Sequence, residues 1–358
     1  MRPTYAEIDL GAIRHNVSAF RELIEPSAVC AVVKADGYGH GDVPVANAAV
    51  DAGAEWLAVA LVEEGARLRE AGVEAPIILL SQPSPESIPD IIRWRLTPTA
   101  YRDDFVEAMA TAGAPFDVHV KIDTGMHRVG VAPEELGRLL AKINASANLN
   151  LAGLWTHFSV ADEDPEYTKL QIELFDETIE GLDPPMVHLA NTAGAALFPE
   201  SRRDMCRIGL GTYGLHPTPE TRQLVSLMPA MKLVSHVSHV QRVAAGERPS
   251  YGRMKELTVD STIATVPVGY ADGFARGLSR YGCSLIGGRR FPLAGAVTMD
   301  QIMINVGDED VAVGNEVVLL GGQGSEEITA DEWAEELETI SYEVVCSIGP
   351  RVPRRYLG

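Results

Sequence analysis

Lys34 stands where a buried apolar segment ends in a glycine-rich turn. The apolar run Val29–Val33 is typical of a buried strand, and the turn Gly37–Gly41 follows shortly after the lysine. A lysine at the C-terminal end of a buried parallel strand is costly to place unless its amine has a chemical role. One such role is to hold an aldehyde cofactor such as pyridoxal phosphate (PLP) as a Schiff base. The alternative is a lysine whose long side chain reaches past the strand end to water.

The first two-thirds of the chain contains the elements that must position this lysine. Eight short apolar runs are strand candidates: Val29–Val33, Trp56–Ala60, Ile77–Leu80, Leu96–Thr97, Val118–Ile122, Leu151–Trp155, Met186–Leu189 and Cys206–Ile208. Helical patterns separate them, as at Glu63–Arg69 and Glu134–Leu140. Eight strands that alternate with helices favour a (β/α)8 barrel over an open sheet. The fourth strand has the weakest support, because Pro98 follows it at once.

Beyond Met228 the pattern changes to strands without intervening helices. The candidates are Met231–Val243, Leu257–Val268, Ser284–Ile286, Met303–Val306 and Val317–Leu320. One helical stretch, residues 329–337, interrupts them, with Thr329 as its N-cap and Glu332 completing a capping box. We therefore predict an α/β chain: a (β/α)8 barrel over residues 11–228 and a C-terminal mostly-β domain over residues 229–358. We expect residues 1–10 to form an N-terminal strand associated with the β domain.

Candidate site residues gather at the predicted strand ends, where barrel enzymes place their active sites. Those at or just after such ends are Lys34, Arg128, His157, Asn191, Thr192, Arg207 and Gly209. Barrels often hold a phosphate in the loops after strands 7 and 8, which here are Asn191–Thr192 and Gly209–Leu210. Thr192 offers a hydroxyl, and Gly209 and Leu210 offer backbone N–H groups. The agreement between residue type and position predicts one pocket at this end of the barrel.

Nine segments, in order along almost the whole chain, resemble the motifs of alanine racemases. They are Val32–Gly41, Lys121–Arg128, Trp155–Phe158, His188–Thr192, Cys206–Gly214, Ser250–Gly252, Val266–Gly273, Met299–Gln301 and Ile340–Glu343. The resemblance implies that Lys34 carries PLP. It also implies a cofactor site formed by Tyr38, His157, Asn191, Thr192, Arg207, Gly209, Leu210 and Tyr342. In this family the residue that matches Arg207 faces the pyridine nitrogen, and an arginine keeps its proton, so that nitrogen stays largely unprotonated.

The resemblance further implies a two-base reaction in a homodimer. Lys34 serves one face of the substrate, and Tyr251 of the partner subunit serves the other. The matching substrate residues are Arg128 for the carboxylate, Met299 and Asp300 from the partner, and Tyr270 at the entrance. Lys121 matches a lysine that many members carry as a carbamate, although a plain salt-bridging lysine is the alternative. His127 departs from the family pattern, because a small residue is expected before Arg128.

Composition narrows the possible roles. The formal net charge of −20 argues against a nucleic-acid partner, and no run approaches the length of a membrane span. The four scattered cysteines lack metal-site spacing, so we expect no metal. With no hydrophobic signal region at the N-terminus, we expect a cytoplasmic enzyme. The reaction implied is interconversion of L- and D-alanine, supplying D-alanine for peptidoglycan precursors. A broader racemase acting on serine and a non-catalytic PLP-binding barrel remain alternatives, although Tyr251 and the β domain count against the second.

Overall fold

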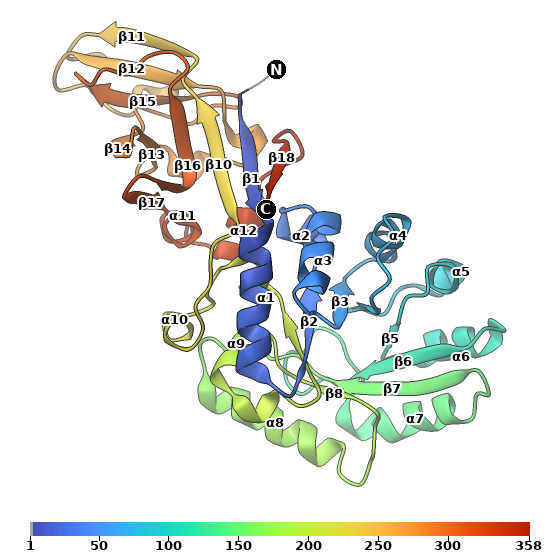
Figure 1. Ribbon diagram of the computed structural model, residues 1–358. Helices are drawn as coiled ribbons and strands as arrows, with labels where there is room; N and C mark the ends of the chain where they lie inside the picture. The colour runs from blue at the N-terminus through green and yellow to red at the C-terminus, as the bar shows by residue number, and fades with distance from the viewer. Residues whose placement is uncertain (1–2) are drawn as a thin grey trace. The chain divides into compact units, whose positions relative to one another are not determined.

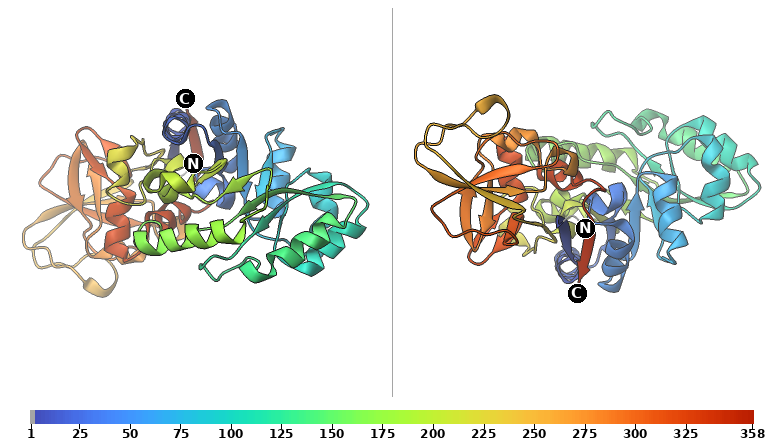
Figure 2. Two further views of the ribbon diagram at one scale, coloured as in Figure 1. Left: turned by 90° about the horizontal axis from the view of Figure 1, so that it is seen from below. Right: turned by 90° about the horizontal axis from the view of Figure 1, so that it is seen from above.

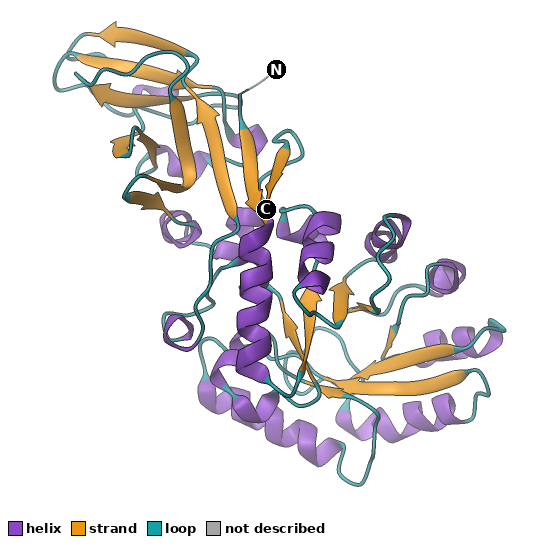
Figure 3. Cartoon of the chain, in the orientation of Figure 1, coloured by secondary structure: helices purple, strands orange, loops and turns teal. Residues whose placement is uncertain are grey.

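The computed structural model describes residues 3–358. Residues 1 and 2, at the start of the predicted N-terminal strand segment, lie outside the described residues. The chain forms two compact units. The first, here called the barrel unit, comprises residues 11–37 and 42–228; the second, the β unit, comprises residues up to 10, 38–41 and 229–358. Figure 3 shows that strands alternate with helices in the barrel unit, whereas strands follow one another in most of the β unit.

Eight short parallel strands form the centre of the barrel unit: β2 (Ala28–Val32), β3 (Trp56–Val59), β4 (Ile77–Leu79), β5 (Thr99–Ala100), β6 (Phe116–Lys121), β7 (Leu149–Trp155), β8 (Val187–His188) and β9 (Met205–Ile208). They form two parallel arcs in the orders β4-β3-β2-β9 and β5-β6-β7-β8. The arcs meet at both ends. Thr97 pairs with Ile78 of β4, and the Arg207 N–H of β9 donates to Ala190 O, two residues beyond β8. The strands therefore close into a ring, which confirms the predicted (β/α)8 barrel.

The helices of the barrel unit are α1 (Leu10–Ile24), α2 (Lys34–Tyr38), α3 (Asp42–Asp51), α4 (Val62–Glu70), α5 (Ile88–Arg93), α6 (Asp103–Thr111), α7 (Leu136–Asn144), α8 (Pro165–Thr178), α9 (Thr192–Leu197) and α10 (Thr221–Leu224). The longer helices lie outside the strands (Figures 1 and 2). Helix α7 shows why: it buries Leu136, Leu139, Leu140 and Ile143, whose spacing makes one apolar stripe. None of the helices in residues 3–358 is long and apolar enough to cross a bilayer.

The fourth barrel strand lies further along the chain than the sequence suggests. The predicted segment Leu96–Thr97 makes only a single bridge, from Thr97 to Ile78, and β5 begins at Thr99. Pro98 has no N–H to donate, but its carbonyl accepts a hydrogen bond of 3.0 Å from His119 N. The chain thus continues to pair across the proline through its acceptor alone, and a proline at this position does not end the strand.

The β unit contains ten strands: β1 (Tyr5–Asp9), β10 (Met231–His236), β11 (His239–Val243), β12 (Ser261–Val266), β13 (Cys283–Ile286), β14 (Arg289–Pro292), β15 (Ile302–Gly307), β16 (Glu316–Gln323), β17 (Glu326–Ile328) and β18 (Arg354–Leu357). One sheet has the order β14-β13-β16-β10-β1-β18, with β17 paired to β16, and a second has the order β11-β12-β15. Strand β1 runs antiparallel to β10 and parallel to β18. This architecture confirms a mostly-β C-terminal part.

Two predictions in the β unit were wrong in detail. The predicted strand Met231–Val243 is two strands in different sheets, because the N–H groups of Val237 and Ser238 donate to Asn315 O and Thr265 O, which belong to different neighbours. In helix α11 (Ala330–Leu337), Thr329 Oγ1 accepts from Glu332 N at 3.0 Å, as expected of an N-cap. The Glu332 carboxylate instead binds the guanidinium of Arg290, so the capping box is incomplete.

A second helix of the β unit, α12 (Ser341–Cys346), was not predicted. Its six residues are too few to show a helical period in the sequence. The helix is relevant to function because it carries Tyr342, one of the candidate cofactor residues.

Candidate active site

Arg207, on β9, is a buried cation at the centre of the barrel unit, with only 3% of its surface exposed. Its Nη1 donates to His188 Nδ1 at 2.7 Å and to His188 O at 3.0 Å. Its Nη2 donates to Thr156 O and Leu189 O, both at 2.8 Å, and lies 3.3 Å from His157 Nδ1. The guanidinium also stacks over the Trp155 ring, 4.6 Å from its centroid. Burial lowers the pKa of Arg207 to about 10, which still leaves it charged at neutral pH.

The Arg207 guanidinium fixes the tautomers of the neighbouring histidines. Burial, followed by the charge of Arg207, holds the pKa of His188 and of His157 well below the usual range. Neutral His188 accepts from Arg207 at Nδ1, so its proton is on Nε2, which lies 2.9 Å from His119 Nδ1. His119 is therefore the acceptor in that pair, and burial lowers its pKa to about 4. A row of neutral imidazoles thus extends from the arginine into the barrel.

One donor of Arg207 is not used by the protein. No acceptor for Arg207 Nε–H lies within hydrogen-bonding distance among residues 3–358, although every other part of the guanidinium is engaged. The Nε atom is not fully buried, so this donor stays open to a ligand. The arrangement is therefore suited to a ligand that presents an acceptor atom without a proton, such as an unprotonated pyridine nitrogen.

Lys34 follows β2, the strand that pairs with β9, so Lys34 and Arg207 come from neighbouring strands. The turn after Lys34 is left-handed: φ is 53° at both Ala35 and Asp36, and 58° at Gly37. Glycine tolerates this region, but each non-glycine residue there costs roughly 1–3 kcal/mol. Tyr38, at the end of the same segment, has φ 51°, so the segment is strained at three positions, and such strain persists only where surrounding contacts enforce it.

The loops after β8 and β9 meet through Thr192. Its Oγ1 accepts from Gly209 N at 3.1 Å and from Gly211 N at 3.4 Å, while Asn191 Oδ1 accepts from Gly194 N at 2.8 Å and caps α9. A side chain at Gly211 would bring its Cβ within 2.3 Å of Phe20, so these loops pack closely. Because the Thr192 oxygen acts as the acceptor, its own proton is available to a ligand. The Gly209 N–H, expected to face a ligand, points to Thr192.

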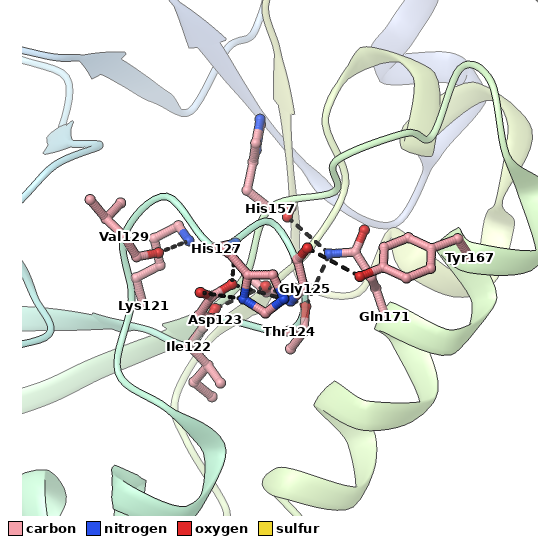
Figure 4. Close-up of polar contacts among 11 residues, drawn as sticks. Lys121, Ile122, Asp123, Thr124, Gly125, His127, Val129, His157, Tyr167 and Gln171 are labelled. Atoms are coloured by element: carbon pink, nitrogen blue, oxygen red, sulfur yellow. Dashed lines mark hydrogen bonds and ion pairs between the residues drawn. The ribbon is translucent and has the colours of Figure 1, made fainter.

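A loop between β6 and α7 is held by the Asp123 carboxylate, which accepts from Gly125 N at 3.2 Å and from His127 N at 3.0 Å (Figure 4). The same carboxylate lies 3.3 Å from His127 Nδ1, on a ring whose side chain is 80% exposed. Burial opposes ionisation of Asp123, but the His127 and Gly125 N–H groups and Lys121 outweigh it, so its pKa is lowered. His127, with φ 54°, thus closes a turn directly before Arg128.

Arg128 itself is exposed and makes no hydrogen bond or salt bridge with any of residues 3–358. Around it, Tyr167 Oη donates to Gly125 O at 3.1 Å, and Gln171 Nε2 lies 3.3 Å from both Thr124 Oγ1 and His157 O (Figure 4). Helix α8, which carries Tyr167 and Gln171, therefore supports the loop from the other side. A guanidinium on a well-held loop is suited to bind a carboxylate.

Lys121 is almost fully buried at the end of β6. Its Nζ donates to Val129 O at 2.6 Å (Figure 4). The same Nζ lies 5.4 Å from the Trp155 ring centroid. Burial is the main cause that lowers the pKa of Lys121 to about 8, and the charges of Arg207 and Arg128 add to it. No salt bridge to Lys121 is found among residues 3–358, so the salt-bridging alternative has no support within this chain.

The other predicted site residues lie in the β unit, where they form two groups. Tyr251, Tyr270 and Met299 are exposed by 74%, 42% and 52%. Their segments are neighbours, because Tyr270 N donates to Thr298 O, Ala271 N donates to Met299 O, and Ser250 Oγ donates to Ala296 O. Asp300, next along the chain, accepts from Arg351 Nη2 at 2.7 Å. Three large side chains exposed together on one surface are typical of an interaction face.

Tyr38 and Tyr342 form the second group, with ring centroids 6.0 Å apart. Burial, with smaller contributions from Tyr342 and Cys346, raises the pKa of Tyr38, so its hydroxyl stays protonated and can donate. The structure thus places the predicted residues in three sets, one in the barrel unit and two in the β unit.

Sequence reasoning missed four residues that the structure ties to the barrel site: His119, Trp155, His188 and Glu64. The first three face the interior with Lys121 and Arg207, and strand alternation could have indicated His119, two residues before Lys121. Glu64 lies on α4, and its carboxylate reaches the turn after Lys34. A glutamate inside a charged helical pattern offers no signal of that contact.

We predict that Asp123→Ala loosens the loop before Arg128. The change removes the acceptor for the Gly125 and His127 N–H groups, and a hydrogen bond to a charged acceptor contributes about 1.5–3 kcal/mol. Amide exchange of residues 124–130, measured by NMR, should therefore quicken by roughly tenfold or more. His127→Ala, which removes the exposed ring and its contact with Asp123 but keeps the His127 N–H bonded to that carboxylate, is the matched control and should change exchange little. Equal exchange in Asp123→Ala and the unaltered protein would contradict this role of the carboxylate.

Comparison with known proteins agrees with this geometry. Residues 8–217 match the model of the alanine racemase N-terminal domain, and residues 230–356 match that of the C-terminal domain. The alanine racemase of Symbiobacterium thermophilum is 44% identical, over all of this chain and 98% of the relative. The crystal structure of the alanine racemase from E. faecalis superposes with a TM-score of 0.94 at 40% identity, covering 99% of this chain and 98% of the other. The crystal structure of the Bacillus anthracis enzyme with bound L-Ala-P superposes with a TM-score of 0.94 at 37% identity. The match covers 100% of this chain and 96% of the other. The chain therefore belongs to the alanine racemase family of amino-acid isomerases.

Proposed function

We propose that this chain, which interconverts L- and D-alanine as its family does, binds PLP through Lys34 and uses Lys34 and Tyr251 as its two bases. The observation that carries the proposal is the buried Arg207, whose Nε–H is the one part of the guanidinium without an acceptor in residues 3–358. That donor suits an unprotonated ring nitrogen. Lys34 follows β2, the strand that pairs with the strand of Arg207, as one cofactor spanning both residues requires.

The residues around Arg207 fit the remainder of PLP. Thr192 would donate its proton to the phosphate, with Asn191, Gly209 and Leu210 shaping the same loops, and Gly209 would have to share its N–H with Thr192. Tyr38 and Tyr342 would add hydroxyl donors, for which the raised pKa of Tyr38 is suitable. His157 would orient Arg207 through its Nδ1. When bound, PLP withdraws electrons from the substrate Cα and makes its proton easier to remove.

The chain's own residues would then move that proton. Lys34 Nζ would take or give it on one face of the substrate, and Tyr251 Oη of the partner subunit on the other. A free tyrosine titrates near about 10, so it needs cations nearby to act as a base at neutral pH. Arg207 with His157 would supply that charge. Arg128, without a partner in residues 3–358, would hold the substrate carboxylate, while Met299, Asp300 and Tyr270 of the partner would border it.

Lys121 is proposed to carry a carbamate. Its buried amine would attack the carbon of CO2, forming an N–C bond and releasing one proton, and the new carboxylate would face Arg128. Only the neutral amine reacts, and because its pKa is about 8, uptake should rise as pH increases through that value. Carbon NMR with isotopically labelled bicarbonate should show one protein-bound carbamate that disappears in Lys121→Ala. An unchanged signal in that variant would assign the carbamate elsewhere.

We further propose that the barrel and β units are the two domains predicted from the sequence, and that the enzyme works in the cytoplasm to supply D-alanine for peptidoglycan. None of the four cysteines, all of which lie in residues 3–358, forms a disulfide, which suits a reducing compartment. No feature of the described residues favours serine over alanine, so alanine remains the proposed substrate.

Lys34 should be the residue that holds the cofactor. We predict that the purified protein absorbs visible light as a PLP enzyme does, and that borohydride reduction fixes the cofactor on a peptide containing Lys34. Lys34→Ala should lose both the covalent label and racemisation, while Lys255→Ala, which changes a lysine of the β unit, should retain both. A reduced cofactor mapped to any other lysine would contradict the proposed site.

The active form should be a homodimer with shared sites. We predict that mixing inactive Lys34→Ala and Tyr251→Phe subunits, by joint unfolding and refolding, restores activity. A two-fold dimer exchanges the same groups in both directions, so each mixed dimer holds one intact site, and random pairing should return about a quarter of normal activity. Each variant refolded alone is the control. Mixed dimers confirmed by mass but without activity would show that both bases come from one chain.

A further inference from the structure

The Glu64 carboxylate joins two loops at the C-terminal rim of the barrel. Its Oε1 accepts from Ala35 N at 2.7 Å, directly after Lys34. Its Oε2 accepts from Ala60 N at 2.8 Å and from Leu61 N at 3.1 Å, where the chain leaves β3. Glu64 is 8% exposed, so these contacts are largely shielded from water. Three backbone donors from the ends of two neighbouring strands thus converge on one side chain.

Helix α4 also holds the far end of the same turn. Arg67, one turn after Glu64, donates from Nε to Asp42 Oδ2 at 2.6 Å, and the two side chains form a salt bridge. Asp42 begins α3, and its N–H donates to Asp36 Oδ1 at 3.2 Å. The hydrogen bond with Asp42, opposed by burial, raises the pKa of Arg67. Two side chains of α4, Glu64 and Arg67, therefore bind the chain after Lys34 and at Asp42.

This arrangement explains how the left-handed turn persists. Ala35 and Asp36 have φ of 53°, which is unfavourable for residues with a side chain, and such a turn reverts unless contacts enforce it. Besides the bond to Glu64, the turn is closed by Gly37 N donating to Val33 O at 3.0 Å. The Val33 N–H, which donates to Ala58 O at 2.9 Å, and the Ala35 N–H thus hold the backbone on the two sides of Lys34, and only the second bond is made by a side chain.

We propose that Glu64 is a positioning residue for Lys34. It acts through the Ala35 backbone, keeping the lysine amine at the angle that proton transfer requires, and Arg67 with Asp42 supports it from the other end. This inference rests on the proposed role of Lys34. The negative charge matters, because all three partners are donors. A glutamine would accept through one oxygen only and would turn an NH2 group toward at least one of those N–H groups.

The test compares Glu64→Gln with Glu63→Gln, its exposed neighbour on the same helix. In Glu64→Gln we expect faster amide exchange at Ala35, PLP still reducible onto Lys34, and a displaced pH midpoint of the visible absorption. A misplacement of about 1 Å can lower turnover by roughly a hundredfold, so kcat should fall about ten- to a hundredfold with little change in KM. Glu63→Gln should match the unaltered enzyme in every measurement.

Three results would overturn the proposal: kcat in Glu64→Gln within about twofold of normal, an equal loss in Glu63→Gln, or unchanged exchange at Ala35. If Glu64→Gln does not fold, two other measurements decide. The Ala35 amide of the unaltered protein must exchange as slowly as those of β2, and Glu64→Asp, too short to span both loops, must lower kcat. Fast exchange at Ala35 in the unaltered protein, or a normal kcat in Glu64→Asp, would refute the positioning role of Glu64. PLP mapped to another lysine would instead refute the proposed function, while exchange at Ala35 would still report on Glu64.

Discussion

The organisation of the barrel site depends on one positive charge that is almost fully buried, that of Arg207. An unpaired buried ion is too unfavourable to persist, so the Arg207 guanidinium requires acceptors on several sides. Carbonyls at and after the ends of β7 and β8 supply them, together with His188, and Trp155 covers the guanidinium face. Because these carbonyls must reach the guanidinium, the ends of β7 and β8 have fixed positions relative to β9. The Nε–H of Arg207 makes none of these bonds. Its direction is fixed because the other nitrogens of the planar guanidinium donate four hydrogen bonds.

The loops around this arginine follow a common rule: the backbone beside each proposed reactive side chain is firmly bonded. Arg128 has no salt bridge in residues 3–358, yet Asp123 anchors the turn before it through His127 N. Lys34 follows the same rule, since its turn is strained but tied to Glu64 through Ala35. Thr192 differs, because its own oxygen bonds Gly209 and leaves only a proton to offer. A rigid backbone beside the reacting side chains favours preorganised binding.

The sequence predicted the barrel well because periodicity and strand ends are local properties. The run Val29–Val33 differs from β2 by one residue at each end, and Trp56–Ala60 differs from β3 by one residue at its C-terminal end. The shift from Leu96–Thr97 to β5 and the division of Met231–Val243 could not be predicted, because both depend on partners distant in the chain, His119 and Thr265. The site residues came from motifs, and they remain predictions. The motifs gave no indication that Glu64 reaches Ala35 or that His188 links Arg207 to His119, since hydrogen bonds between distant elements leave no local pattern.

The central claim is that Arg207 presents its N–H to a ring nitrogen that must not be protonated. Its most direct test is the ratio of racemisation to transamination in PLP-loaded Arg207→Glu, measured by chiral analysis of alanine and by pyruvate formation. A carboxylate would favour the protonated nitrogen and draw electrons from the substrate more strongly. Racemisation should then fall and the share of transamination rise, while PLP stays bound to Lys34. An unchanged ratio with normal turnover would contradict the claim and remove Arg207 from the pyridine site.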